Sequence, residues 1–193
     1  MRNFAKPILN SLLIIMLIVL ANPLYGSTES LPEDPMLPQP NAALQPGDVV
    51  QIVINALASN DYPFPDAGIE TTFNFASPSN KTQTGPLKNF TKILKGPTFK
   101  QMINHRDSTL SEVILEENRA LRLVQIISAD NETLYFAFRL RLQQQGRYAG
   151  MWLTDSVWPL DGPNDDILDL VVDKSALYQN NVINSGPKLV WSI

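Results

Sequence analysis

The spacing of apolar residues changes once along the chain, from a helical period to a strand period. Between residues 48 and 108, apolar side chains recur every three or four positions, which is typical of amphipathic helices. From Thr109 onward they recur at every second position, which is typical of strands with one buried face. The pattern therefore predicts helices first and a meandering antiparallel sheet second.

Two helices are predicted before the first long polar segment. The first opens at residues 46–48 with Asp48 as its N-cap, and it ends near Asn60 because Pro63 cannot continue it. The second runs from residue 66 or 67 to Ala76 and buries one apolar face.

A polar segment and a third helix complete the first half. Residues 77–84 are predicted to be a loop. The third helix then has Thr84 as its cap, Pro86 in its first turn and Gly96 at its end. One more helical turn is expected at residues 99–103.

Four strands are predicted in the second half. The third alternates most regularly, since Phe136 and Phe138 fall on one face while Arg139 and Arg141 fall on the other. A sheet with one apolar face needs a cover, which the preceding helices can supply. The predicted fold class is therefore α+β, with N-terminal helices packed on a curved four-stranded antiparallel sheet. The predicted strands are residues 110–115, 120–127, 133–142 and 148–158.

The N-terminus carries the pattern of an export signal. Arg2 and Lys6 precede an uninterrupted apolar run of ten residues, Leu12 to Ala21. Ten residues make about 15 Å of helix, roughly half the hydrocarbon core of a bilayer. This length favours a cleaved signal peptide, and hence a periplasmic or secreted protein, over a spanning helix. An uncleaved N-terminal membrane anchor is the alternative.

The chain divides into four segments on composition. A signal peptide at residues 1–26 is followed by a proline-rich tether at 27–46, which has five prolines and few bulky apolar residues. One domain of ordinary size is expected at residues 47–160. Residues 161–193 form a C-terminal extension that contains a short amphipathic stretch and an apolar end.

Charge and composition exclude several classes of partner and cofactor. Without Arg2 and Lys6 the chain has 13 basic and 19 acidic residues, a net charge of −6, which argues against nucleic acid and anionic membranes as partners. The absence of cysteine excludes thiol nucleophiles, zinc–thiolate sites and disulfides. With His105 as the single histidine, multi-histidine metal sites are excluded as well, so no metal and no cofactor are expected.

Short polar and aromatic motifs are spread along residues 48–158. They are Asn60-Asp61, Gly68-Ile69 through Phe73, Phe75 to Pro78 with Asn80, Gly85-Pro86 with Phe90, Asn104-His105, and Tyr148 to Gly150 with Trp152, Thr154-Asp155 and Val157. With these motifs, the order of elements resembles the cone of the NTF2-like (cystatin-like) superfamily, and more closely a bacterial and plastid-lineage group known as domain-of-unknown-function family 4864. The resemblance departs at Ser156, where glycine is expected. It implies a pocket between sheet and helices, which some members of the superfamily use for catalysis and others for binding.

Asp155 is the most informative acidic residue. Period 2 places it on the inward face of the fourth strand with Met151, Leu153 and Val157. A carboxylate in that position can serve as a general base or hold a donor group of a ligand. The alternative is that a bulge near Gly150 reverses the strand, or that Asp155 accepts structural hydrogen bonds from backbone or arginine donors.

Four further residues are candidates for the site. His105 follows the last helical turn and can act as an acid or base, or can cap that turn. Asn80 lies where it can line the opening of a pocket, or it can form a turn. Phe73 and Trp152 are core residues by pattern, and they can also line an apolar pocket.

Two classes of function remain open. The favoured hypothesis is a non-enzymatic exported module that binds a small molecule or a protein, with a homodimer as one form of partnership. The alternative is a small-molecule enzyme that transfers a proton or dehydrates its substrate with Asp155 and His105. A closed, packed cone favours the first, and an open cavity with a polar base favours the second.

Overall fold

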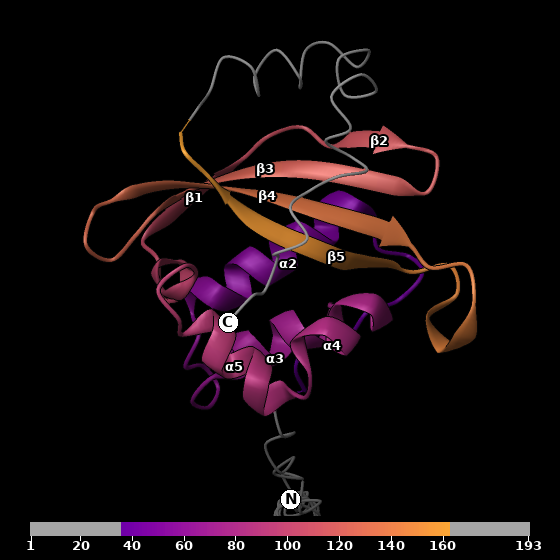
Figure 1. The fold of residues 1–193 in the computed structure, drawn as a ribbon, viewed down its shortest axis with the longest axis horizontal. Helices are drawn as coiled ribbons and strands as arrows, with labels where there is room; N and C mark the ends of the chain where they lie inside the picture. The colour runs from indigo at the N-terminus through magenta and orange to yellow at the C-terminus, as the bar shows by residue number, and fades with distance from the viewer. Residues whose placement is uncertain (1–35, 163–193) are drawn as a thin grey trace, which may run out of the picture. The chain divides into compact units, whose positions relative to one another are not determined.

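The computed structural model describes residues 36–162, so the predicted signal peptide and most of the C-terminal extension lie outside the described residues. Within this range four α-helices accompany an antiparallel sheet of five strands that does not close into a barrel (Figure 1). The predicted α+β class is therefore confirmed. The elements are α2 (Pro46–Ala58), α3 (Ala67–Asn74), α4 (Pro78–Thr84), α5 (Leu87–Leu94), the 3-10 helix η1 (Lys100–Met102), β1 (Asp107–Leu110), β2 (Ile114–Glu116), β3 (Arg119–Ile127), β4 (Thr133–Leu142), the 3-10 helix η2 (Gly146–Tyr148) and β5 (Trp152–Leu160).

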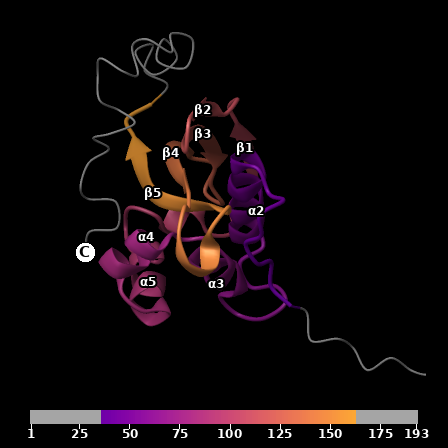
Figure 2. The same ribbon diagram turned by 90° about the vertical axis from the view of Figure 1, so that its right-hand side faces the viewer.

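The helices α2 to α5 all lie against one face of the sheet, which we call the inner face (Figures 1 and 2). The strand order is β1-β3-β4-β5. Strand β2, like β1, pairs with β3. Strand β4 is central, and its Phe136, Phe138 and Leu140 are buried on the inner face as predicted. They pack against the apolar stripe of α2, which consists of Val49, Val50, Val53, Ile54 and Leu57.

The predicted first strand is two strands separated by an irregular segment. Both β1 and β2 pair with β3, and their registers differ by one residue. Ser111 holds the segment between them, because its N–H donates to Leu123 O (2.9 Å) and its Oγ accepts from Leu123 N (3.0 Å). Arg122 Nε also donates to Ser111 O at 2.9 Å. A side-chain oxygen thus takes the place of a ladder partner, which apolar periodicity cannot reveal.

The predicted loop at residues 77–84 is helix α4, so this prediction was wrong. Ser77 is the N-cap, and its Oγ accepts a hydrogen bond from Asn80 N at 3.1 Å. Pro78 occupies the first helical position, and Gly85 ends the helix with a φ of 78°. A serine cap, a proline at the first position and a terminal glycine are ordinary helix signals. The short polar sequence between them lacks an apolar stripe and concealed the helix.

Two predicted caps are corrected. Gln45 is the N-cap of α2, and Asp48 lies at the third helical position, where its carboxylate accepts from Gln45 N at 2.8 Å in a capping box. Thr84 ends α4, and Pro86 is the N-cap of α5. The helices themselves fall within about two residues of the predicted bounds.

Asn60 joins three helical segments through a buried hydrogen-bond network. Its Oδ1 accepts from Ile69 N (3.1 Å), and its backbone O accepts from Gly68 N (2.9 Å) at the start of α3. Its backbone N–H donates to Asn104 Oδ1 at 3.0 Å, next to η1. The Asn60 and Asn104 motifs that carry the family resemblance therefore have a structural role in this chain.

Asp61 belongs to the same network, and its hydrogen bonds favour the ionised carboxylate. Its carboxylate accepts from Asp66 N at 3.0 Å, from Asn60 Nδ2 at 2.8 Å and from Asn104 Nδ2 at 3.1 Å. The backbone hydrogen bond from Asp66 is the largest cause that lowers the pKa of Asp61 below 3.8, followed by the bond from Asn104. A lowered folded-state pKa stabilises the protein above the unfolded value, and this contribution is lost as pH falls through the folded value.

Asp61→Asn is expected to reduce the loss of stability on acidification. Urea unfolding measured at pH 5 and near pH 3 should show a smaller difference for this variant than for the wild type. Glu112→Gln, at an exposed position, serves as the control and should keep the wild-type difference. If Asp61→Asn loses as much stability between pH 5 and pH 3 as the wild type does, the lowered pKa of Asp61 does not contribute to stability.

Candidate functional site

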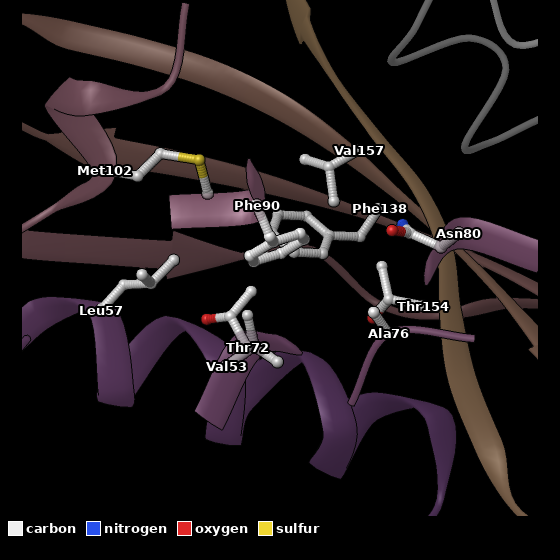
Figure 3. Close-up of a pocket in the computed structure, with 10 residues that line it drawn as sticks. All are labelled: Val53, Leu57, Thr72, Ala76, Asn80, Phe90, Met102, Phe138, Thr154 and Val157. Atoms are coloured by element: carbon white, nitrogen blue, oxygen red, sulfur yellow. The ribbon is translucent and has the colours of Figure 1, made fainter. Parts of the chain in front are cut away.

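A small cavity lies between the helices and the inner face of the sheet (Figure 3). Side chains from all four helices, from η1 and from the two strands β4 and β5 surround it. Its lining residues are Val53, Leu57, Thr72, Ala76, Asn80, Phe90, Met102, Phe138, Thr154 and Val157.

The cavity is closed and almost filled. Its volume is about 10 Å³, and a cavity needs roughly 10–15 Å³ to hold one water molecule. Seven of its lining side chains are apolar, while Thr72, Asn80 and Thr154 are polar. Thr72 Oγ1 donates to Gly68 O at 2.8 Å, whereas Asn80 Oδ1 and Thr154 Oγ1 have no hydrogen-bond partner within the described residues. The polar end of the cavity has space for one water but not for a metabolite.

A parallel bridge between Ala76 and Thr154 positions the polar end of the cavity. Thr154 N donates to Phe75 O and Ser77 N donates to Thr154 O, both at 2.9 Å. The linker between α3 and α4 is thereby held on the free edge of β5. Asn80, in the first turn of α4, then reaches the same strand, where its Nδ2 donates to Asp155 O at 3.2 Å.

Asp155 does not line the cavity, and its predicted inward placement is corrected. Between Arg139 and Leu140 the register of β4 with β5 shifts by one residue, which leaves Asp155 without a paired residue on β4. Leu153 pairs with Arg141 and Val157 pairs with Phe138, so the two residues lie on opposite faces. Asp155 instead accepts from Arg141 Nε at 2.7 Å. Of the alternatives, the hydrogen bond from an arginine is the observed one, whereas the register shift lies at Asp155 itself and not near Gly150.

Asp155→Asn is expected to lower the free energy of unfolding by about 1–2 kcal/mol, because it replaces a charge-assisted hydrogen bond by a neutral one. The Asp155 side chain is 7% exposed and that of Arg141 is 53% exposed, which keeps the expected loss below that of a fully buried pair. Asp130→Asn, in the exposed turn after β3, is the control and should change the melting temperature little. A variant at least as stable as wild type would point to a functional carboxylate.

His105 is buried beside the end of η1 rather than in the cavity. Its Nδ1 lies 2.8 Å from Met102 O, so the ring donates to the carbonyl of the last residue of η1. This contact corresponds to the capping alternative, and it leaves His105 outside the set of lining residues. The structure therefore does not bring His105 and Asp155 together at the cavity.

Of the predicted binding residues, Asn80 lines the cavity, while Phe73 and Trp152 do not. Phe73 packs edge-to-face on Phe90 with ring centroids 5.2 Å apart, and Trp152 belongs to the apolar core.

A cation–π contact of Lys81 lies beside these residues. Lys81 Nζ lies 5.0 Å from the Phe73 centroid and 5.3 Å from that of Tyr148. Burial is the main cause that lowers the pKa of Lys81. This cation–π contact was not predicted, because it depends on helix α4.

Two polar lining residues were also missed by sequence reasoning. Thr72 lies three residues after Ile69 on the apolar face of α3, a spacing that could have identified it. Thr154 pairs with the inner-face Leu140 only because of the register shift at Asp155, so the predicted alternation placed it on the wrong face. The signal for Thr72 was present, but a single hydroxyl among apolar positions does not by itself indicate a site.

Comparison of the chain with protein-family models, with curated proteins and with solved structures found no match in any of the three. Within residues 36–162, no helix has the length and hydropathy needed to cross a membrane. The same range holds no group of three or more His, Cys, Asp or Glu side chains that could bind a metal ion.

Proposed function

We propose that the chain is an exported, non-enzymatic binding module of the NTF2-like superfamily, similar to domain-of-unknown-function family 4864. Export rests on Arg2, Lys6 and the apolar run that follows them. The superfamily assignment rests on the motifs given above and on the order of elements, helices first and then an antiparallel sheet that they cover on one face.

The closed cavity is the observation that favours binding over catalysis. A substrate needs room beside an acid or base, and the cavity of about 10 Å³ has neither of the two candidate groups in its wall. Asp155 is paired with Arg141, and His105 is bonded to Met102 O. A proton-transfer or dehydration mechanism would require both side chains to leave these partners.

A larger recess on the surface of α4 and α5 is the proposed binding surface. Its volume is about 710 Å³, within the range of roughly 300–1,000 Å³ that is usual for ligand sites. Most of its lining residues are threonine, glutamine, asparagine or glycine, but apolar atoms supply most of its exposed surface, with Ile93 and Phe99 as large apolar contacts and Lys92 as the charged group. The remaining lining residues are Thr82, Gln83, Thr84, Gly85, Asn89, Gly96, Pro97 and Thr98.

The proposal is tested by a thermal-shift screen of polar metabolites and short peptides against three proteins. These are the wild type, Asn89→Trp, which fills the surface recess, and Thr154→Val, which removes a hydroxyl from the inner cavity. Compounds that raise the melting temperature of the wild type should do so in Thr154→Val and fail in Asn89→Trp. The opposite pattern would place the site in the cavity, and turnover that is lost in His105→Gln and Asp155→Asn would make the protein an enzyme.

A further inference from the structure

The face of the sheet opposite the helices, which we call the outer face, is apolar at its centre. Antiparallel partners point to the same side of a sheet, so the register places Leu153 beside Arg141, Trp158 beside Ala137 and Leu121 beside Arg139. Arg139 and Arg141 alternate with the inner-face residues Phe138 and Leu140 along β4, which assigns these pairs to the outer face. The outer-face apolar set is Leu121, Ala137, Leu153 and Trp158.

The helices do not account for the burial of this set. Leu121 is 3% exposed, Leu153 is 0% exposed and Trp158 is 7% exposed. None of them belongs to the core cluster on the inner face, and α2 to α5 lie on the other side of the sheet (Figure 2). Ser156, which pairs with Arg139, is also buried, and its Oγ has no hydrogen-bond partner within the described residues. These side chains require a cover with both apolar and polar groups.

Three arginines lie close together on the outer face. Arg119 pairs with Arg141 and, on its other side, with Glu116. Arg139 lies two residues before Arg141 on the same strand, so three guanidinium groups share this face with the carboxylates of Asp155 and Glu116. The Arg139 guanidinium lies 5.8 Å from the centroid of the Trp158 ring. Burial is the main cause that lowers the pKa of Arg139, and the like charges of Arg141 and Arg119 lower it further against the opposing effect of Asp155. Such a surface favours an occupant that carries carboxylates.

The sequence that follows β5 combines carboxylates with apolar side chains. Strand β5 ends at Leu160, and Asp161 and Gly162 connect it to the 31 residues 163–193. The first of them combine carboxylates with an apolar stripe at helical spacing. The carboxylates are Asp165, Asp166, Asp169 and Asp173, and the stripe is Ile167, Leu170 and Val171.

We propose that residues 163–173 bind across the outer face of the sheet, with their aspartates against Arg119, Arg139 and Arg141 and their apolar residues against Trp158 and Leu153. The reach is sufficient, because eleven residues span about 16 Å as a helix, the conformation that the stripe implies. Four neighbouring strands span only about 15 Å between their first and last axes. The segment thereby completes the cover that the outer-face apolar set needs.

A second copy of the chain fits this face less well than the chain's own extension. Two outer faces packed together would bring two arginine clusters into contact, and like charges oppose each other across an interface. A segment tethered to β5 has, in contrast, a millimolar effective concentration at the face and carries the opposite charge.

Disulfide trapping in the full chain tests the proposal, and the absence of natural cysteine leaves no background reaction. Ala137→Cys on the outer face is combined with Leu170→Cys in the extension. The control combines Leu170→Cys with Lys88→Cys, on the exposed side of α5. Under mild oxidation the first pair should form an intramolecular disulfide at least about ten times faster than the control, as read from non-reducing gels and peptide mass spectrometry.

Leu123→Cys, also on the outer face because Leu123 pairs with Ala137, replaces Ala137→Cys if that variant does not fold. Equal trapping rates for outer-face and control pairs would overturn the proposal, and so would a predominantly intermolecular disulfide, which would indicate a second copy.

A charge variant tests the role of the aspartates. The triple change Asp165→Asn, Asp166→Asn and Asp169→Asn should slow trapping of the outer-face pair several-fold, and 0.5 M salt should slow the unmodified pair in the same direction. Trapping that is insensitive to both changes would overturn the assignment of the arginine cluster as the docking surface.

Discussion

Phe138→Ala is expected to lower the free energy of unfolding by about 3–5 kcal/mol, as is usual for the loss of a fully buried aromatic side chain. Phe138 is 1% exposed, lies on the central strand β4 and forms part of the cavity wall. The cavity already has space beside this ring, so truncation enlarges an existing void that the helices α2 to α5 cannot collapse into without losing their other contacts. Phe136→Ala, one inner-face position earlier, should cost a similar amount.

Urea unfolding monitored by circular dichroism measures this loss. Leu115→Ala is the matched control, because Leu115 is a large apolar residue of the same sheet that is 55% exposed. Its substitution should change the free energy of unfolding by about 0.5 kcal/mol or less. A loss below about 1 kcal/mol for both phenylalanines would mean that the inner face is not the core of this domain.

Gly68→Ala is the second substitution with a large expected effect, a loss of about 3 kcal/mol or more, at the upper end for overpacking. A Cβ at this position would lie 2.2 Å from Ala56 O, 2.8 Å from Ala56 C and 2.9 Å from Asn60 Cα. All three atoms are backbone atoms of α2 and the turn that follows it. The clash can be relieved only if α3 moves away from α2, which would also break the Gly68 N to Asn60 O hydrogen bond.

Gly47→Ala provides the matched control for this substitution, because Gly47 and Gly68 both occupy the second position of their helices. A Cβ at Gly47 would meet only side-chain atoms, at 3.3 Å from Arg122 and Val113, which can shift. Thermal unfolding should therefore show a large fall in melting temperature for Gly68→Ala and a small change for Gly47→Ala. Equal effects of the two substitutions would contradict close backbone contact between α2 and α3.

The elements that could be predicted are those with a continuous apolar pattern. Strand β4 was identified with its true bounds, and its alternation assigned Phe136 and Phe138 to the buried face. Helix α4 was missed because it is short and has few apolar residues, so its stability comes from caps and from its contact with β5. The predicted first strand became two, because the Ser111 side chain interrupts the ladder.

The residues of the candidate site also divide into those that local patterns identified and those that they misplaced. Asn80 was a candidate either for the opening of a pocket or for a turn, and it lies in helix α4, where it lines the small inner cavity and not an opening. Asp155 was predicted to face inward, but one extra residue in β5 reverses the alternation that this prediction assumed. Because the side-chain period in a strand is two, a single inserted residue moves every following side chain to the other face. Nothing in the local sequence marks that insertion.

The fold class, the order of helices and strands, and the buried face of β4 could be predicted, because each of these follows from local periodicity repeated over many residues. The closed cavity, the pairing of Asp155 with Arg141 and the contact of His105 with the end of η1 became apparent only from the folded arrangement. These features depend on how separate elements meet, to within about one residue or one ångström. Local patterns carry no information on that scale, since the free energy that selects among such arrangements comes from contacts between residues distant in the chain.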